Sequence, residues 1–299
     1  MRSLIIVNPS AGQGKPAGFA NEIEAVFRES GRTLVFTNDV GDAERIARDA
    51  AASGIYDELL AAGGDGTINE VVNGVLKGQP EFEKRPVIGL ISLGSQNVLA
   101  QELGLPIGKI SELRDVFVRG HYRTIDLGMA GERYFTLMAG FGFDAAVVSD
   151  VTRPIKELIG SAAYAFATLG ALAKYHSTSV RLVLDNEEIK SEAFLIIVAN
   201  ASMYAYRQIK LAPFASIDDG WLDICVFERA PNDRVGFVTQ LLAVLAARHL
   251  KDPRVRYYRA RSIYIESSPP INGQVDGDVS ERTPVKIEVV PKSLKVYAP

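Results

Sequence analysis

Hydrophobic and polar residues alternate in two different ways along this chain of 299 residues. In the first third, short apolar runs typical of buried strands alternate with segments whose apolar residues recur at helical spacing. One such helix carries its apolar residues between Phe19 and Phe27 and is expected to stop at Gly31, and another is closed by Gly54. Strict alternation of strand and helix predicts a parallel sheet covered on both faces. The strand-like runs are residues 4–7, 33–37, 58–62 and 86–91, and the second helix covers residues 42–52.

Beyond about residue 123 the pattern becomes mostly strand-like, with short turns such as Asp185-Asn186. This pattern predicts a second, mostly antiparallel β domain, interrupted by helices near residues 154–175 and 234–250. We therefore expect two domains, residues 1–124 and 125–299, packed closely with a cleft between them. The predicted strands lie within residues 123–130, 133–140, 179–199, 221–228, 261–266 and 285–291.

Composition and charge exclude several classes of protein. The 33 basic and 36 acidic residues give a formal net charge of -3, so no nucleic-acid partner is expected. Cys225, the single cysteine, lies in an alternating segment and is expected in the core. Because the chain begins with only four consecutive apolar residues and contains no long apolar run, we expect neither a signal peptide nor a transmembrane helix. A soluble cytoplasmic protein is the expectation.

The segment GGDGTINEVVNG, residues 63–74, joins a glycine-rich turn to an amphipathic helix. Thr67 and Glu70 have the spacing of a capping box, which predicts that the helix begins at Thr67. The free N–H groups at a helix start favour a phosphate, and glycines allow close approach and positive φ where needed. This turn is therefore a candidate phosphate site.

Asp65 places a negative charge in the middle of that candidate site. Three roles are open to it on the residues alone. It is a turn residue that bonds its own backbone, a ligand of Mg²⁺ whose charge reconciles carboxylate and phosphate, or a base that takes a proton from an attacking hydroxyl.

The order and spacing of several motifs resemble those of the diacylglycerol-kinase-like lipid kinase family, which also includes sphingosine, ceramide and bacterial lipid kinases. The motifs are VNPSAGQG, GGDGTINEVVNG, IGLISLGSQNVLAQELGLP, AGFGFDA, IKLAPFASIDDGWLDI and NGQVDGD. The resemblance implies an N-terminal α/β domain of the NAD-kinase and phosphofructokinase type and a C-terminal β-sandwich, with residues 285–299 a candidate to return to the first domain. It also implies ATP and Mg²⁺ as cofactors and a lipid hydroxyl as acceptor.

The resemblance also assigns site residues. It implies that Asp65 and Asp278 are catalytic, and that Asp219 binds a structural Mg²⁺ with carbonyl groups from Ser216 and Trp221. Read alone, Asp278 and Asp219 are equally typical of turns, and so is Asn8 beside Pro9. The nucleotide-contacting positions that the resemblance implies are Asn8, Ser10, Gly12, Thr37, Gly63, Gly64, Gly66, Thr67, Gly94, Ser95 and Asn97.

Two positions depart from the family pattern. The loop that usually ends in an acid has Val98 here, and an aliphatic side chain cannot bind Mg²⁺. The usual D-G-E has Asp278 in place of glutamate, which moves the carboxylate by about one C–C bond, and misplacement by ~1 Å can cost ~100-fold in rate. Lys15, Arg207 and Lys210 are further candidates to reach phosphate.

The sequence thus predicts an ATP- and Mg²⁺-dependent kinase acting on a diacylglycerol-like or related lipid at the inner face of a membrane. Its two apolar helices, residues 154–175 and 234–250, are candidates for contact with the membrane surface as well as for core packing. Two alternatives remain: an NAD-kinase-like enzyme acting on a soluble dinucleotide, and a lipid- or nucleotide-binding protein with weak catalysis. Formation of a homodimer is left open.

Overall fold

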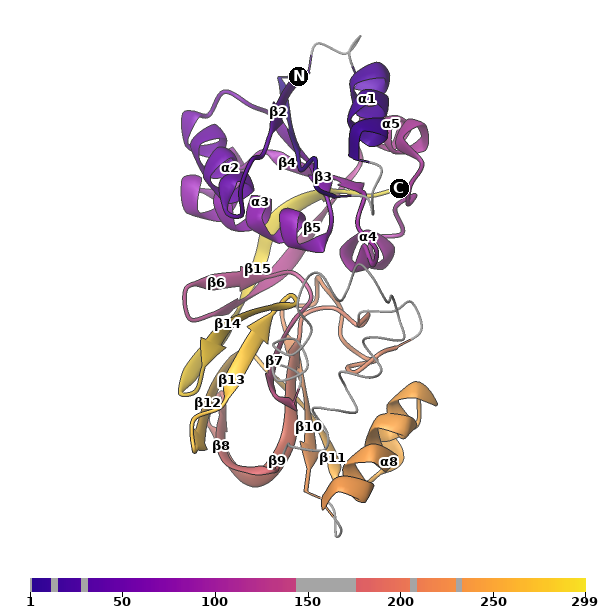
Figure 1. Ribbon diagram of the computed structural model, residues 1–299. Helices are drawn as coiled ribbons and strands as arrows, with labels where there is room; N and C mark the ends of the chain where they lie inside the picture. The colour runs from indigo at the N-terminus through magenta and orange to yellow at the C-terminus, as the bar shows by residue number, and fades with distance from the viewer. Residues whose placement is uncertain (1, 12–15, 28–31, 144–175, 205–208, 230–232) are drawn as a thin grey trace. The chain divides into compact units, whose positions relative to one another are not determined.

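Figure 1 shows the computed structural model, which describes residues 2–11, 16–27, 32–143, 176–204, 209–229 and 233–299. The chain forms two compact units. The first comprises Met1–Asp126 together with Pro291–Pro299, and the second comprises Leu127–Val290. The chain therefore passes from one unit to the other twice.

A parallel sheet forms the centre of the first unit, as the sequence predicts. Its strands follow the order β2-β1-β3-β4, and all three neighbouring pairs are parallel. The end of β15 adds to the sheet, because Val296 pairs in parallel with Ile88 of β4. Side chains of β1 and β3 are fully buried. The strands are β1 (Ser3–Val7), β2 (Thr33–Phe36), β3 (Glu58–Gly63), β4 (Val87–Ser92) and β15 (Val285–Tyr297).

Helices cover both faces of this sheet, which confirms the predicted layers. In Figure 1, α2 and α3 lie together on one face, and α1 and α5 lie together on the other. Residues 28–31, where the first helix was expected to stop, lie outside the described residues. The helices are α1 (Pro16–Phe27), α2 (Asp42–Ser53), α3 (Asp65–Gly78), the short η2 (Phe82–Lys84), α4 (Val98–Glu102) and α5 (Ile110–Arg119).

The start of α3 differs from the prediction. The helix begins at Asp65, two residues before Thr67, because Gly64 is extended (φ -86°, ψ -177°) and its carbonyl already accepts the N–H of Ile68 at 3.1 Å. No capping box forms. The Thr67 hydroxyl accepts a hydrogen bond from Asn8, and the Glu70 carboxylate accepts the N–H of Gly41. Both side chains bond to other segments of the first unit, which local spacing does not reveal.

The second unit is mostly antiparallel, as predicted. Its main strand order is β14-β13-β7-β9-β8-β12-β15, with β10 between β9 and β11, and a β5-β6 hairpin. The Asp185-Asn186 turn joins β8 to β9. The strands are β5 (Tyr122–Ala130), β6 (Arg133–Phe135), β7 (Met138–Gly142), β8 (Thr178–Leu184), β9 (Glu187–Ala199), β10 (Leu222–Glu228), β11 (Val255–Ala260), β12 (Ser262–Ser268), β13 (Asn272–Val275) and β14 (Asp278–Arg282).

The core of this unit contains Phe135, Phe141, Ile196 and Ile263, all less than 2% exposed. Cys225 is fully buried, which confirms its predicted place, and burial raises the pKa of its thiol to about 12. A buried thiol with a raised pKa is not a nucleophile. The cysteine therefore acts as a small apolar residue.

Two element boundaries in the second unit differ from the prediction. The strand expected over residues 133–140 is broken into β6 and β7, because the N–H groups of Thr136 and Leu137 bond to the side chain of Asp276. The helix expected over residues 234–250 is α8 (Asp233–Leu245), followed by the short η3 (His249–Lys251). It ends early because Ala247 adopts a left-handed conformation (φ 52°).

Candidate active site

The predicted nucleotide residues of the first unit lie where the strands of its sheet end. Asn8 follows β1, Thr37 follows β2, Gly64 and Asp65 follow β3, and Gly94 lies just after β4. Because the strands are parallel and in register, these carboxyl ends meet at one edge of the sheet. Ligands of open α/β sheets bind at this edge.

Asn8 links two of the loops at this edge. Its Nδ2 donates to Oγ1 of Thr67 at 2.9 Å, and its Oδ1 accepts the N–H of Ser10 at 2.9 Å. The first bond spans 59 residues of sequence. Asn8 therefore closes its own turn, as a strand-end residue does, and also fixes the first turn of α3.

Close approach of other atoms requires a glycine at positions 63 and 94 of this edge, but not at position 66. None of Gly63, Gly64 and Gly66 has the positive φ that the sequence left open. A Cβ on Gly94 would lie 2.6 Å from the Cα of Gly64, so the loops after β3 and β4 touch through their backbones. A Cβ on Gly66 would meet nothing within 4 Å. The start of α3 therefore has room beside an exposed backbone.

Asn97 shapes the loop after β4. Its Oδ1 accepts the N–H of Gly94 at 2.8 Å, its Nδ2 donates to the carbonyl of Gly94 at 2.7 Å, and its own backbone is left-handed (φ 52°). An asparagine tolerates this conformation and can pair in both directions. The side chain thus holds the loop in a tight turn that leads into α4.

Asp65 is tied to the same loop. Its Oδ1 accepts the backbone N–H of Val98 at 2.8 Å, although the two residues are 33 positions apart. The carboxylate is half-buried at the first position of α3, where the helix dipole favours a negative charge. A simple turn residue would bond only its own backbone, whereas Asp65 contacts a distant loop.

The remaining predicted residues differ in their exposure. Thr37 is buried, and its N–H donates to the carbonyl of Val7 at 2.9 Å. Ser10 and Ser95 are exposed. Gly12 and Lys15 lie outside the described residues, as do Arg207 and the helix predicted over residues 154–175. Lys210, in the second unit, is exposed.

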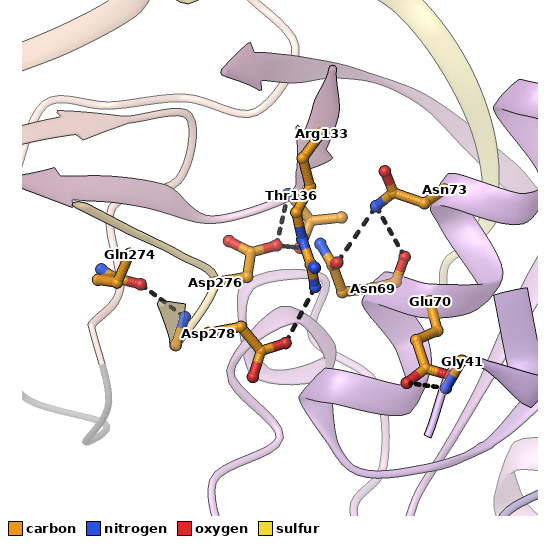
Figure 2. Close-up of polar contacts among 10 residues, drawn as sticks. Gly41, Asn69, Glu70, Asn73, Arg133, Thr136, Gln274, Asp276 and Asp278 are labelled. Carbon is orange, nitrogen blue, oxygen red and sulfur yellow. Dashed lines mark hydrogen bonds and ion pairs between the residues drawn. The ribbon is translucent and has the colours of Figure 1, made fainter. Parts of the chain in front are cut away.

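In the second unit, Asp276 anchors the hairpin that carries Asp278. Asp276 and Gly277 both have positive φ (46° and 90°) and form the two-residue turn between β13 and β14. The Asp276 carboxylate accepts four hydrogen bonds, which Figure 2 shows in part. The pKa of Asp276 is raised above its ordinary value, because the effect of burial exceeds the opposing effect of these hydrogen bonds. The donors are the N–H and hydroxyl of Thr136 and the N–H groups of Leu137 and Met138.

Asp278 lies at the start of β14 with its side chain half exposed. It forms an ion pair with Arg133 of β6, with 2.9 Å between Nη2 and Oδ2 (Figure 2). The turn itself is further fixed by Gln274, whose Oε1 accepts the N–H of Gly277 at 2.6 Å. The sequence did not indicate Arg133 or the role of Asp276. The available signals were an Asp-Gly turn and the family D-G-E pattern, and neither identifies a partner 140 residues away.

The loop around Asp219 does not fit a resident cation as it is arranged. The Asp219 carboxylate is ion-paired with Arg259, and its Oδ1 accepts the N–H of Trp221 at 3.1 Å. Ser216 donates to Asp218 at 2.9 Å. A divalent ion would have to displace the guanidinium from the carboxylate. The structural Mg²⁺ stays a prediction, and nothing below depends on it.

A Mg²⁺ carried by a nucleotide does fit at Asp65. No cluster of three or more acidic, histidine or cysteine side chains suited to a metal occurs among the described residues. Mg²⁺ needs no such cluster when it arrives with phosphates, because it commonly keeps several waters and binds one or two carboxylates. A single half-buried carboxylate beside a helix start meets that requirement.

Comparison with known proteins identifies the family. Residues 2–130 match the model of the diacylglycerol kinase catalytic domain, and residues 138–298 match that of the YegS C-terminal NAD kinase beta sandwich-like domain. The chain belongs to the diacylglycerol-kinase-like family of lipid kinases. Both the predicted family and the predicted fold class are therefore confirmed.

Individual relatives resemble the chain along its whole length. A diacylglycerol kinase of Staphylococcus saprophyticus is 30% identical, and the alignment covers 100% of this chain and 95% of the relative. A diacylglycerol kinase of Bacillus subtilis strain 168 is 29% identical, and the alignment covers 100% of this chain and 96% of the relative. A crystal structure of a diacylglycerol kinase from Bacillus anthracis strain Sterne has the same fold, with a TM-score of 0.74 at 23% identity and coverage of 100% and 97%.

Proposed function

We propose that the chain is a kinase that transfers the γ-phosphate of ATP to a hydroxyl of a diacylglycerol-like lipid, with Mg²⁺ bound to the nucleotide. The observation that carries this proposal is the edge of the first unit, where three loops and the start of α3 are linked around Asp65. Family membership supports the lipid as acceptor, since relatives that align over the whole chain are named diacylglycerol kinases.

The start of α3 would hold the nucleotide phosphates. The first N–H groups of a helix have no partner within the helix, and the helix dipole makes this end positive. The open space beside Gly66 lets a phosphate approach the backbone, and the bond between Asn8 and Thr67 keeps that backbone in place. We propose that the other predicted nucleotide positions of this edge, such as Thr37 and Asn97, either shape the binding site or contact the nucleotide.

Asp65 would lie beside the Mg²⁺ that the nucleotide carries. Bound Mg²⁺ would offset the charge of the phosphates and of the carboxylate together. The hydrogen bond from Val98 fixes the direction of the carboxylate before the nucleotide arrives. In phosphoryl transfer most of the rate comes from such positioning and charge neutralisation.

We assign Asp278 to the acceptor hydroxyl. A carboxylate held on a rigid hairpin can take the proton that the hydroxyl loses when it attacks the phosphorus. Arg133 keeps the Asp278 carboxylate in one orientation through their ion pair, and Asp276 keeps the hairpin turn in place. An exposed ion pair of this kind contributes only about 0–1 kcal/mol to stability, so we assign it to positioning.

A second function, binding with weak catalysis, is favoured by one observation. Val98 occupies the position where the family loop usually has an acid, and its side chain is only 5% exposed. At positions 65 and 98 the chain therefore offers one carboxylate where the family pattern has two. Weaker metal binding and slower turnover follow if that second acid normally helps to hold Mg²⁺.

One experiment separates these proposals from the NAD-kinase-like alternative. The purified full chain is incubated with labelled ATP, Mg²⁺ and a total lipid extract, and in parallel with NAD, and the labelled product is identified. We expect label in a lipid of the diacylglycerol type and none in NAD. Label in NAD alone would make the chain a dinucleotide kinase, and binding of ATP or lipid without transfer would favour the weak-catalysis alternative.

A further inference from the structure

Helix α8 of the second unit is apolar on both of its sides. Residues 235–247, VGFVTQLLAVLAA, contain no charged residue. Such a helix is normally buried all round or in contact with lipid. In this unit only one side is packed, which raises the question of what the other side contacts.

The packed side of α8 lies against the β-sheet of its own unit. Phe237 is 1% exposed and stacks on Phe194 of β9, with 4.6 Å between ring centroids and an interplanar angle of 11°. It also meets Phe143 edge-to-face at 5.0 Å. Val244, two turns further on, is 5% exposed. These contacts fix the orientation of the helix about its axis.

The opposite side is exposed. Val235 is 67% exposed, Leu242 is 58% exposed and Leu245 is 65% exposed. At about 100° per residue, Val235 and Leu242 point in almost the same direction, and Phe237 and Val244 point the opposite way. Leu245 lies about 60° further round from Leu242, on the same exposed side. Three large apolar side chains on one side of a helix differ from the scattered single exposures that are normal for a surface.

The end of this row is basic. Arg248 and Lys251 follow the helix, both are exposed, and the sequence has no acid from residue 234 to residue 251. Apolar side chains next to exposed cations complement an anionic lipid surface.

We propose that this surface of α8, formed by Val235, Leu242, Leu245, Arg248 and Lys251, docks the protein on an anionic membrane. The apolar row enters the boundary between headgroups and acyl chains, and the two cations bind phosphate groups of the lipids. The inference rests on the proposed function only in choosing a bilayer as the occupant. No helix among the residues that the structure describes is long and apolar enough to span a membrane.

Vesicle flotation of the full chain without nucleotide tests the proposal. The vesicles contain phosphatidylcholine alone or phosphatidylcholine with phosphatidylglycerol. We expect binding to the anionic vesicles that weakens as salt is raised. We expect Leu242→Gln with Leu245→Gln to weaken it at least about tenfold, because two large apolar side chains no longer enter the bilayer. Arg248→Gln with Lys251→Gln should lower binding to the anionic vesicles alone.

A matched control replaces two exposed valines of the first unit. Val40 and Val118 are 74% and 69% exposed. Val40→Gln with Val118→Gln should leave vesicle binding unchanged, and the thermal midpoints of all variants should match that of the native chain. Equal binding by the α8 variant and the native chain, or no binding by the native chain, overturns the proposal.

Two further measurements separate the outcomes. Light scattering that shows a dimer, dissociated by the α8 substitutions, would identify a second copy as the occupant and would also overturn the membrane proposal. Phosphate transfer to diacylglycerol dispersed in detergent, assayed on the same variants, should be unchanged. A chain that binds vesicles but transfers no phosphate would contradict the proposed function and leave the docking surface supported.

Discussion

Asp65 and Val98 are joined by a hydrogen bond of 2.8 Å from the backbone N–H of Val98 to Oδ1 of Asp65. The backbone of Val98 therefore orients the Asp65 carboxylate, although the Val98 side chain is not the acid that the family usually has there. The side chain of Val98 is buried. The loop keeps the geometry that orients Asp65 and lacks the second carboxylate.

Asp65→Asn should remove activity while preserving the fold. The amide keeps an oxygen that can accept the Val98 N–H, so the link between the two loops survives. The negative charge is lost, and we expect turnover to fall about 100-fold or more, a loss typical of removing one electrostatic group from an active site. Turnover of labelled ATP and the thermal midpoint are measured together. Unchanged turnover would contradict the assigned role.

Val98→Asp should make stability depend on Mg²⁺. Without metal, the new carboxylate is buried near Asp65, and we expect a loss of about 2–4 kcal/mol in the free energy of unfolding. Mg²⁺ should recover part of this loss, because two carboxylates and several waters suit the ion. Denaturant titrations with and without Mg²⁺ measure the effect.

The size-matched Val98→Asn is the control for Val98→Asp, and it should be insensitive to Mg²⁺. A Val98→Asp variant whose stability ignores Mg²⁺ would show that the position does not face a metal. Combined with Asp278→Glu, the same substitution addresses catalysis. A steep rise in turnover from near zero in the double variant would identify the native chain as a weakened kinase.

Asp276→Ala should weaken both the second unit and the reaction. It leaves the N–H groups of Thr136, Leu137 and Met138 without their acceptor, at a cost of about 2–4 kcal/mol. The hairpin then no longer holds Asp278 in place, and kcat should fall more than KM changes. The matched control is Asp185→Ala. Asp185 also has positive φ in a hairpin turn and accepts two backbone N–H groups, but it should affect stability alone.

Tyr297→Phe should lower stability without changing activity. The Tyr297 hydroxyl donates to Glu58 at 2.6 Å, and the buried Glu58 also accepts bonds from Ser3 and Arg32. Loss of one donor to a buried carboxylate costs about 1–3 kcal/mol. Glu58 begins β3, whereas the glycine loop follows the other end of that strand, so kcat/KM should not change. The exposed Tyr122→Phe is the control and should leave the thermal midpoint unchanged, and a drop in kcat/KM for Tyr297→Phe would contradict this separation.

His249 should make the second unit sensitive to acid. Burial lowers the pKa of His249 from its ordinary value of 6.5. Below pH 6.5 the unfolded chain binds a proton at this residue while the folded chain does not, until the lower folded pKa is passed. Stability from this group is therefore present above pH 6.5 and is lost as the pH falls through that window. His249→Gln should reduce the difference in thermal midpoint between pH 7 and pH 5, and an unchanged difference would contradict this role.

Much of the fold follows from periodicity, because each strand or helix must bury its own apolar residues. The alternation before residue 123 predicted the parallel sheet and its helices, and the later alternation predicted the antiparallel unit. The prediction for the start of α3 was wrong, because Thr67 and Glu70 bond to Asn8 and Gly41 and not to each other. Local spacing cannot distinguish a residue that caps its own helix from one that contacts a distant loop.

For the candidate site, too, some features could be predicted from the sequence and others could not. Which residue types line the carboxyl edge of the parallel sheet could be predicted from the sequence, since each motif directly follows a predicted strand. Only the tertiary structure decided that Asp65 is oriented by the backbone of Val98, that Asp278 is paired with Arg133, and that residues 291–299 belong to the first unit. These relationships join positions far apart in the chain. They depend on how packed elements bring backbones within hydrogen-bonding distance, which no local pattern of residues encodes.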